Sequence, residues 1–342
     1  MATKEKTLWF CTNCGNESPK WMGRCPACGE WNTMVEQTVA TGKPSRNQPH
    51  AVSSGNKPLH LKEIDSSSEN RMSIGMSEVD RLLGGGIVRG SLVLIGGEPG
   101  IGKSTLSLQI PLGSPGMKTL YVSGEESARQ VKMRAERLGG DDSNCFIFSE
   151  TDITNIIAQA DALKPDLMVV DSVQTMFSPN VESSAGSVTQ IKEVTAMLLH
   201  FAKMSGIPVI LIGHITKDGY IAGPKILEHI VDVVLQFEGD NKGSYRLLRS
   251  IKNRFGSTSE LAVFEMTGKG LREVTNPSEM LIPMHEAGLS GTAICAMLDG
   301  LRPFLFEVQA LVSSAAYGTP QRSATGFDVR RLNMLLAVLE KR

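Results

Sequence analysis

The sequence carries no dominant charge and no long apolar run. Its 35 lysines and arginines nearly balance 36 aspartates and glutamates, so the formal net charge is −1 over 342 residues. A chain this neutral has no global basic field, and any surface for nucleic acid must be local. No apolar run approaches the ~18 residues that a membrane helix needs, and the charged start Met-Ala-Thr-Lys-Glu-Lys-Thr is unlike a secretion signal. We therefore expect a cytoplasmic protein with no membrane partner.

Cysteine is scarce as well. The chain has 6 cysteines, and most of them form two Cys-x-x-Cys pairs, each followed by glycine. Two thiolates on a tight turn can bind one metal ion, and two such pairs form the closed tetrahedral site that is typical of structural zinc. Two disulfides or a redox pair are the alternatives, which a reducing compartment disfavours. The predicted zinc ligands are Cys11, Cys14, Cys25 and Cys28.

A phosphate-binding loop is the most informative feature that is present. Residues 97–104 read Gly-Glu-Pro-Gly-Ile-Gly-Lys-Ser, after an apolar run at 91–96 and before a helical pattern. In this setting the loop amides and the helix N-terminus converge on phosphates. Lys103 would reach the β- and γ-phosphates of ATP, and Ser104 would bind Mg²⁺. The residues predicted to bind ATP are Gly97, Glu98, Pro99, Gly100, Ile101, Gly102, Lys103, Ser104 and Thr105.

Polar side chains end three further apolar runs. Asp171 follows Leu-Met-Val-Val and is expected at the carboxyl edge of a sheet, where it would help to hold Mg²⁺. Glu125 and Glu126 follow another strand; one of them would polarise the attacking water, unless both only stabilise a helix start. His214 also ends a strand, either as a contact to the γ-phosphate or as a satisfied polar cap.

Composition divides the chain into four parts. Residues 1–37 hold the cysteine pairs and all 3 tryptophans, which either pack around the zinc or, in at least one case, stack on a base. Residues 38–59 are rich in Ser, Gly, Pro, Asn and Lys and are expected to form a flexible linker. Residues 60–275 alternate apolar strands with helical stretches, which predicts an α/β fold with a mostly parallel sheet. Residues 276–342 form the last part.

The apolar patterns place the elements of the third part. Strands are expected at 91–96, 119–123, 145–148, 167–170, 208–212, 231–237, 245–251 and 262–266, and helices at 104–110, 126–138, 152–163 and 187–204.

The order of motifs resembles one known family. The cysteine pairs, Ser77-Glu-Val-Asp-Arg-Leu-Leu-Gly-Gly-Gly-Ile, the phosphate loop, Tyr121-Val-Ser-Gly-Glu-Glu-Ser, Val170-Asp-Ser-Val-Gln-Thr and Lys252-Asn-Arg-Phe-Gly256 follow one another. Over essentially its whole length the chain resembles the bacterial RadA (also called Sms) family of DNA recombination and repair ATPases, within the RecA superfamily. The Lys-Asn-Arg-Phe-Gly block is the most specific mark.

The resemblance implies a RecA-type, DNA-stimulated ATP hydrolase of the DNA damage and stress response. It implies a homo-oligomeric ring, expected to be a hexamer, that binds single-stranded DNA and promotes branch migration of branched recombination intermediates, with RecA as a further partner. Glu125 takes the place of the catalytic glutamate, and His214 that of the γ-phosphate sensor. The alternatives are a KaiC-like or ring-helicase-like NTPase with another substrate, or a nucleotide-gated DNA-binding module with weak hydrolysis.

Two basic residues are expected to act between subunits. Lys252 and Arg254 lie one residue apart, so in an extended segment both side chains point to the same face and can reach one phosphate. RecA-type ATPases complete their site with basic residues of the next subunit, and this pair matches that position. We predict that both act in trans on a neighbour's ATP; a solvated pair of cations is the alternative.

The resemblance also locates DNA-binding loops. By the resemblance, residues 176–187 and 215–225 face the position of the DNA-binding loops of RecA; ordinary mobile surface loops are the alternative. They carry little charge beyond Lys217 and Lys225. We therefore expect modest, salt-sensitive, sequence-independent binding to single strands.

The last part resembles the opening portion of the Lon peptidase domain, with strands expected around 291–298 and 304–312 and an amphipathic helix at 327–339. We expect a shortened member of the family without protease activity.

Overall fold

The computed structural model describes residues 5–12, 16–40, 60, 71–214, 224–239, 244–282, 290–299, 302–314, 318 and 321–341. Cys14, Lys217 and most of the predicted linker lie outside these ranges, as does the segment 215–223. The chain forms two compact units, one of residues 1–277 with 298–303 and the other of 278–297 with 304–342. The four-part division drawn from the sequence stays a prediction.

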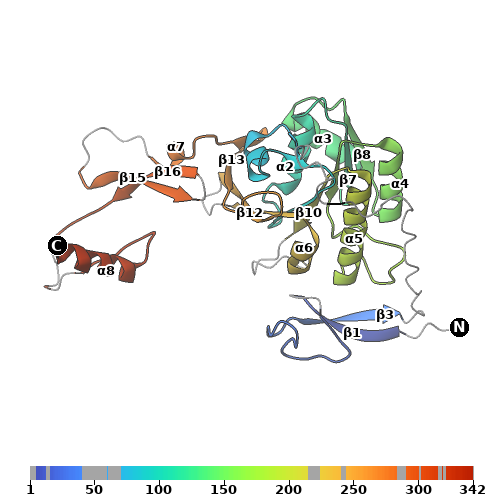
Figure 1. Ribbon diagram of the computed structural model, residues 1–342, viewed down its shortest axis with the longest axis horizontal. Coiled ribbons are helices and arrows are strands. Elements are labelled where there is room, and N and C mark those ends of the chain that lie inside the picture. Colours follow the sequence, from blue (N-terminus) through green and yellow to red (C-terminus); the bar gives the residue numbers. More distant parts are fainter. Residues whose placement is uncertain are drawn as a thin grey trace. The chain divides into compact units, whose positions relative to one another are not determined.

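A nine-stranded sheet forms the centre of the first unit (Figure 1), in the order β14-β13-β12-β11-β6-β10-β9-β7-β8. Six strands run parallel to their neighbours: β6 (Leu92–Gly97), β7 (Thr119–Ser123), β8 (Cys145–Ser149), β9 (Leu167–Asp171), β10 (Val209–His214) and β11 (Val233–Gly239). Three strands extend the sheet antiparallel: β12 (Tyr245–Asn253), β13 (Leu261–Thr267) and β14 (Gly270–Glu273). The predicted α/β fold with a mostly parallel sheet is confirmed.

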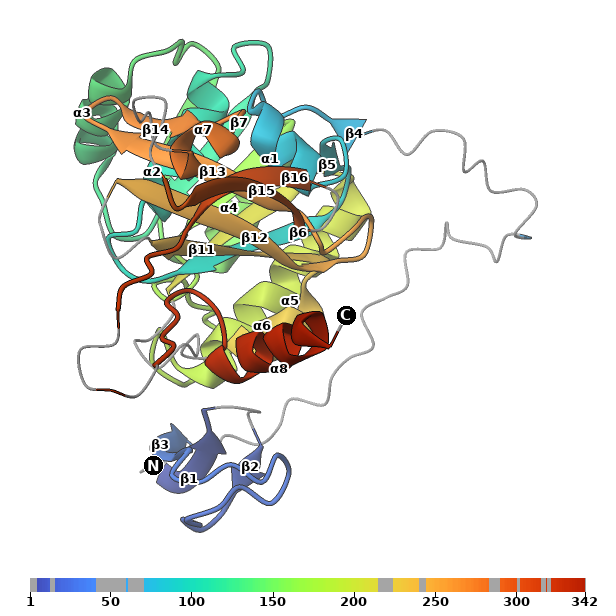
Figure 2. The same ribbon diagram turned by 90° about the vertical axis from the view of Figure 1, so that its left-hand side faces the viewer.

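Helices cover both faces of this sheet (Figure 2). Because side chains alternate along a strand, Val93 and Ile95 of β6 join one apolar cluster while Leu92 and Leu94 join the other. The first cluster includes side chains of α1 (Ser77–Leu82), α2 (Lys103–Leu112) and α3 (Ala128–Leu138). The second includes side chains of α4 (Ile153–Leu163), α5 (Val188–Ser205) and α6 (Pro224–Ile230).

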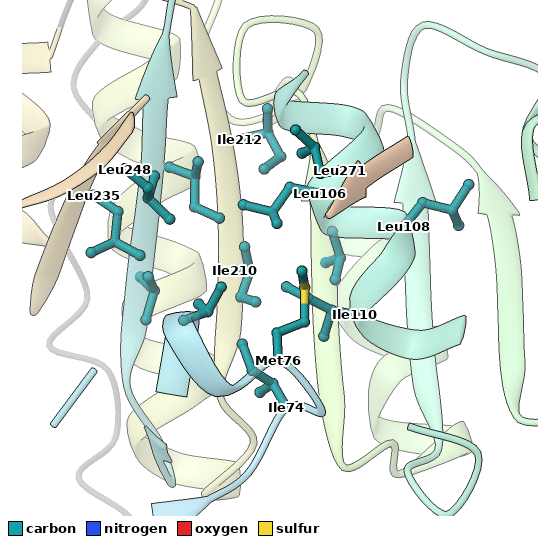
Figure 3. Packing of buried hydrophobic residues seen from close by; sticks show 14 of the residues in the cluster. Ile74, Met76, Leu106, Leu108, Ile110, Ile210, Ile212, Leu235, Leu248 and Leu271 are labelled. Carbon is teal, nitrogen blue, oxygen red and sulfur yellow. The ribbon is translucent and has the colours of Figure 1, made fainter. Parts of the chain in front are cut away.

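Figure 3 shows the first cluster at close range, with Leu106 and Ile110 of α2 directed at Ile210 and Ile212 of β10. All these side chains are buried, so the helix that follows the phosphate loop is fixed to the sheet by apolar packing.

The predicted strands and long helices agree with the structure to within a few residues, because each carries a strong apolar period or a cap. Ser127 caps α3 and exchanges hydrogen bonds with Gln130, and Asp152 caps α4. Within residues 60–275 the elements that the patterns missed are short: α1, α6, β14, β4 (Arg71–Met72) and β5 (Ile87–Val88).

The N-terminal residues form a small sheet in the order β2-β1-β3, from β1 (Glu5–Cys11), β2 (Glu17–Ser18) and β3 (Met34–Ala40). Its apolar centre consists of Cys11, Cys25 and Met34, with Trp9 and Cys28 packed against them. This arrangement confirms the predicted zinc ribbon as part of the fold.

Towards the C-terminus, the chain forms α7 (Ser278–Leu281), then β15 (Thr292–Asp299) and β16 (Arg302–Gln309), which pair with each other, and then α8 (Val329–Glu340). The two strands and the helix were expected close to these positions. None of the residues of α8 is buried, although Met334, Leu335, Val338 and Leu339 are apolar.

Candidate nucleotide site and metal centre

The phosphate loop joins β6 to α2. Gly100 (φ +76°) and Gly102 (φ +115°) adopt the left-handed backbone region that favours glycine. A Cβ at Gly97 would lie 2.8 Å from the carbonyl oxygen of Phe237, whereas nothing lies within 4 Å of the Cβ position at Gly100. The loop therefore turns tightly and leaves open space beside Gly100. It places the N-terminus of α2 at the carboxyl edge of the sheet.

Lys103, the first residue of α2, folds back over this loop. Its side chain is buried, and Nζ donates hydrogen bonds to the carbonyl oxygens of Gly97 and Glu98, each at 2.8 Å. Burial lowers the pKa of Lys103 to about 8, although the charges of Asp171 and Glu125 act in the opposite direction. Phosphate oxygens can replace the two carbonyls as acceptors, so the glycine loop, the helix N-terminus and this lysine fit a nucleoside triphosphate.

Asp171 ends β9 and is held by a buried tyrosine. The hydroxyl of Tyr121 donates to Oδ2 of Asp171 at 2.7 Å and lies 3.4 Å from Oγ of Ser107 on α2. Burial and the Asp171 charge raise the pKa of Tyr121 well above its ordinary value, so the phenol remains a donor. Together with the Ser104 hydroxyl in the first turn of α2, this carboxylate provides the oxygen ligands that Mg²⁺ prefers.

The structure separates the two glutamates that follow β7. Glu126 forms an ion pair with Arg134 of α3. Glu125 instead accepts a hydrogen bond from Oγ of Ser172 at 2.7 Å, and its Oε1 lies 3.5 Å from Nε2 of His214. Only Glu125 therefore joins the group of side chains at the strand ends.

His214 lies at the end of β10. The side chain is 32% exposed, and among the described residues its Nδ1 is buried without a hydrogen-bond partner. The amide of Gln174 approaches the backbone oxygen of His214 at 3.5 Å, at the limit of a hydrogen bond.

Strand register brings these groups to one edge. His214 is the register partner of Gly97 between β10 and β6, and Ser123 is that of Asp171 between β7 and β9. Because the strands are parallel, the phosphate loop, Asp171, Glu125 and His214 all leave the sheet at its carboxyl edge. The structure thus assembles at one edge four features that the sequence analysis took from separate motifs.

Lys252 and Arg254 lie at the opposite edge. In the antiparallel pair β11–β12, Lys252 faces Val234 and Asn253 faces Val233, and Val233 in turn is the partner of Val93 near the start of β6. Lys252 therefore stands at the amino edge of the parallel strands, away from the chain's own phosphate loop, and Arg254 follows it. This position gives no support to action on the ATP of the same subunit, and the action in trans stays a prediction.

The loop at 176–187 is organised by a buried glutamine. Gln190 of α5 accepts a hydrogen bond from the backbone N–H of Ser178, and its Nε2 donates to carbonyl oxygens of Ser178, Val181 and Ser183. Of the two loops predicted to bind DNA, this one is described in full. Lys217 and the side chain of Lys225 in the other lie outside the described residues.

The metal centre rests on three described cysteines. The sulfurs of Cys11, Cys25 and Cys28 lie within 4.8 Å of one another, and those of Cys11 and Cys28 are 3.6 Å apart. A tetrahedral ion with Zn–S bonds of about 2.3 Å places its sulfurs about 3.8 Å apart, so these residues fit zinc. Cys14, the fourth predicted ligand, lies outside the described residues.

The tryptophans of the ribbon differ in their surroundings. Trp9 packs against the cysteine cluster, whereas Trp21 and Trp31 are 56% and 67% exposed. The guanidinium of Arg24 lies 5.9 Å from the centre of the Trp31 ring, within the range of a cation–π contact. Of the two alternatives drawn from the sequence, packing around the metal holds for Trp9, whereas Trp21 and Trp31 are exposed.

Sequence patterns did not identify the side chains that form hydrogen bonds with the predicted site residues. Tyr121 supports Asp171, Ser172 supports Glu125, and the buried Asp232 contacts Arg254. Each contact is long-range in sequence, so no local spacing identifies it. Among the described helices, none is long and apolar enough to cross a membrane.

Comparison with known proteins gives consistent results. Residues 56–220 match the family model of an AAA domain, and residues 9–36 match that of a rubredoxin metal-binding domain. The DNA repair protein RadA of Bacillus subtilis is 49% identical over 99% of this chain and 75% of its own length. The DNA repair protein RadA of Chlamydia trachomatis is 49% identical over 100% of this chain and 75% of its own length.

Among solved structures, the KaiC-like protein PH0186 of Pyrococcus horikoshii OT3 superposes with a TM-score of 0.50 at 22% identity, over 60% of this chain and 100% of its own. At that identity the likeness concerns the fold alone.

Proposed function

Because the chain belongs to the RadA family of DNA repair proteins, we propose that it is a DNA-stimulated ATPase that binds single-stranded DNA and promotes branch migration of recombination intermediates. The observation that carries the proposal is the convergence of the phosphate loop, Asp171, Glu125 and His214 on one sheet edge. ATP supplies the phosphoanhydride bond that is hydrolysed, and Mg²⁺ neutralises its phosphate charge. No proteolysis is part of the proposal.

Each residue of the edge has a separate task. Lys103 exchanges its two loop carbonyls for phosphate oxygens and faces the negative charge that develops there. Ser104 and Asp171 hold Mg²⁺, with Tyr121 keeping the Asp171 carboxylate in place. Glu125 accepts a proton from the attacking water, and Ser172 fixes the orientation of its carboxylate.

His214 links the nucleotide to the segment that follows it. Its Nε2 lies near Glu125, so a γ-phosphate beside that glutamate is also within reach of the imidazole. The residues after β10 correspond to a predicted DNA-binding loop, so His214 transmits the presence of the γ-phosphate to that segment.

Completion of the site requires a second subunit. The cations Lys252 and Arg254 stand at the edge opposite the phosphate loop, which suits a head-to-tail ring in which each amino edge faces the next carboxyl edge. In such a ring, expected to be a hexamer, this pair stabilises transition-state charge on the neighbour's ATP.

A pair of adjacent variants tests the catalytic assignment. Glu125→Gln should lose about 10²–10⁴-fold in hydrolysis rate while still binding ATP, because only the proton acceptor is removed. Glu126→Gln is the matched control, since Glu126 is engaged with Arg134, and it should keep the rate within about threefold. Equal losses in both variants would contradict the assignment.

The DNA assignment is tested by measuring ATP hydrolysis with and without single-stranded DNA, and particle mass with and without nucleotide. We expect stimulation by DNA and assembly with nucleotide. A DNA-independent rate would favour a KaiC-like NTPase. Nucleotide-dependent DNA binding without turnover in the unmodified chain would favour a nucleotide-gated binding module.

A further inference from the structure

A buried carboxylate at the amino edge of the sheet contacts two cations. Asp232, just before β11, is 1% exposed. Its Oδ2 accepts hydrogen bonds from the backbone N–H of Leu92 at 3.0 Å and from Nζ of Lys203 at 2.7 Å. Its Oδ1 accepts a hydrogen bond from Nη1 of Arg254 at 3.2 Å. A buried charge is costly unless it is paired and hydrogen-bonded, and here both oxygens are engaged.

The two oxygens have different partners. Oδ2 faces the strand start and Lys203, which lies in the last turn of α5. Oδ1 faces Arg254, whose backbone N–H also donates to the carbonyl oxygen of Asp232. Asp232 therefore holds Arg254 through both the main chain and the side chain of the aspartate. The hydrogen bonds that Oδ2 accepts do not depend on either of these contacts.

Arg254 remains accessible in this arrangement. Its side chain is 51% exposed, and the contact with Asp232 uses one of its terminal nitrogens. A guanidinium carries five N–H donors in a rigid fork, so an arginine held at one corner still presents donors to a phosphate.

Lys252 is engaged differently. Its Nζ donates to the carbonyl oxygens of Glu228 and Val231, at the C-terminal end of α6. Two of its three donors are therefore occupied by a helix end, where a cation is favourable. Of the two cations, Arg254 is the one whose charge faces outward.

The neighbouring residues restrict the same segment. Oδ1 of Asn253 accepts from the backbone N–H of Phe255, and Nζ of Lys203 lies 5.8 Å from the centre of the Phe255 ring. The Asn253 contact and the two hydrogen bonds from Arg254 to Asp232 hold the turn that carries Arg254. Lys203, which is ion-paired with Asp232, lies near the ring at the end of this turn.

We propose that Asp232 is the positioning residue for Arg254: its buried carboxylate fixes the guanidinium so that the remaining donors point to the ATP of the adjacent subunit. The inference rests on the proposed action of Arg254 in trans. It assigns Asp232 no contact with nucleotide.

The test compares Asp232→Asn with Lys203→Met. The amide oxygen of asparagine can still accept from Leu92, but the charge that holds Arg254 is lost. We expect kcat for ATP to fall about 10- to 100-fold, as for other small misplacements of a catalytic group, with KM changed less than about threefold. Lys203→Met removes the other ion pair of the same carboxylate but leaves its hydrogen bonds from Leu92 and Arg254, so kcat should stay within about threefold.

Mixing experiments distinguish positioning from general damage. Asp232→Asn subunits keep their own phosphate loop, so mixing them with Lys103→Ala subunits should restore hydrolysis at up to about one quarter of the interfaces of a random ring. Mixing them with Arg254→Ala subunits should restore nothing, because neither partner offers a correctly placed arginine.

Three results would overturn the inference. They are unchanged kcat in Asp232→Asn, a loss of kcat in Lys203→Met equal to that in Asp232→Asn, or no restoration by Lys103→Ala subunits although these restore Arg254→Ala subunits. The mixture of Lys103→Ala and Arg254→Ala subunits also distinguishes failure of positioning by Asp232 from failure of the action of Arg254 in trans. If Lys103→Ala and Arg254→Ala subunits do not complement each other, the action in trans fails first.

Discussion

Between residues 8 and 36 few side chains are fully buried, among them Phe10, Cys11, Cys25 and Met34, whereas every residue of β6 is buried. The ribbon is too small to enclose an apolar core, and the sulfurs that would hold zinc occupy its centre. The ATPase sheet has an apolar cluster on each face. The two regions thus obtain their stability from different sources, metal–thiolate bonds in one and apolar burial in the other.

The same contrast applies to function. In the sheet, buried polar side chains such as Tyr121 and Asp171 meet at a strand edge that apolar packing keeps rigid. In the ribbon, the large side chains Trp21 and Trp31 face outward, and the fitted metal site leaves no open ligand position if Cys14 completes it. The sheet is therefore suited to chemistry, and we propose that the exposed indoles of the ribbon serve recognition.

Zinc removal should separate the two regions most strongly. We expect one zinc per chain, and its removal by a chelator should unfold the ribbon, because structural zinc contributes about 10–16 kcal/mol to such modules. All 3 tryptophans lie in the ribbon, so tryptophan fluorescence reports on this region alone. Far-ultraviolet circular dichroism should show the helices of the ATPase part retained.

The control for this measurement is re-addition of zinc, which should restore the fluorescence. Loss of the helical signal together with the fluorescence would show that the two regions do not have separate sources of stability. Elemental analysis that finds no zinc in protein purified without chelator would contradict the metal assignment itself.

Lys103→Ala should have the next largest effect. The variant loses the cation that faces developing phosphate charge, and hydrolysis should fall about 10³-fold or more. The ribbon should keep its zinc and its fluorescence, since the chemistry belongs to the other region. Lys269→Ala, at an exposed position between β13 and β14, is the control and should hydrolyse ATP at the unmodified rate.

The pH dependence of ATP binding tests the same residue. Because the pKa of Lys103 is lowered to about 8, the lysine is charged below this pH and neutral above it. A neutral lysine does not attract phosphate, so ATP affinity should fall as pH rises through 8, by up to about tenfold per pH unit. Lys103→Ala should bind ATP weakly and without this dependence. An equal dependence in both proteins would assign it to another group.

The fold could be predicted largely from the sequence, because strands such as 167–170 are continuous apolar runs and helices such as α3 carry caps. The phosphate loop, Asp171 and the zinc ligands could be predicted as site residues because each belongs to a local sequence pattern. Their convergence followed from one rule, that parallel strands end at one edge.

Other parts of the site could not be predicted. Which of Glu125 and Glu126 joins the other site residues depends on Arg134, which pairs with Glu126 from the second turn of α3. The contact of Asp232 with Arg254 depends on how β11 pairs with β12. Such contacts arise from tertiary packing, and a pattern within one segment does not contain them. Which of the three tryptophans pack against the cysteine cluster could not be predicted either, since small modules do not bury every large side chain.

The smallest expected effect concerns the ribbon surface. Trp31→Ala should change ribbon stability by less than about 0.5 kcal/mol, because the side chain is 67% exposed and its cation–π contact is with Arg24 at the surface. Trp9→Ala, its counterpart beside the cysteine cluster, should weaken zinc retention clearly. The measurement is zinc release against increasing chelator, followed by a colorimetric indicator. If both variants release zinc at the same chelator concentration as the unmodified protein, Trp9 does not support the metal centre. If Trp31→Ala releases zinc as early as Trp9→Ala, the outer indole stabilises the ribbon, and its exposure would no longer indicate a surface reserved for recognition.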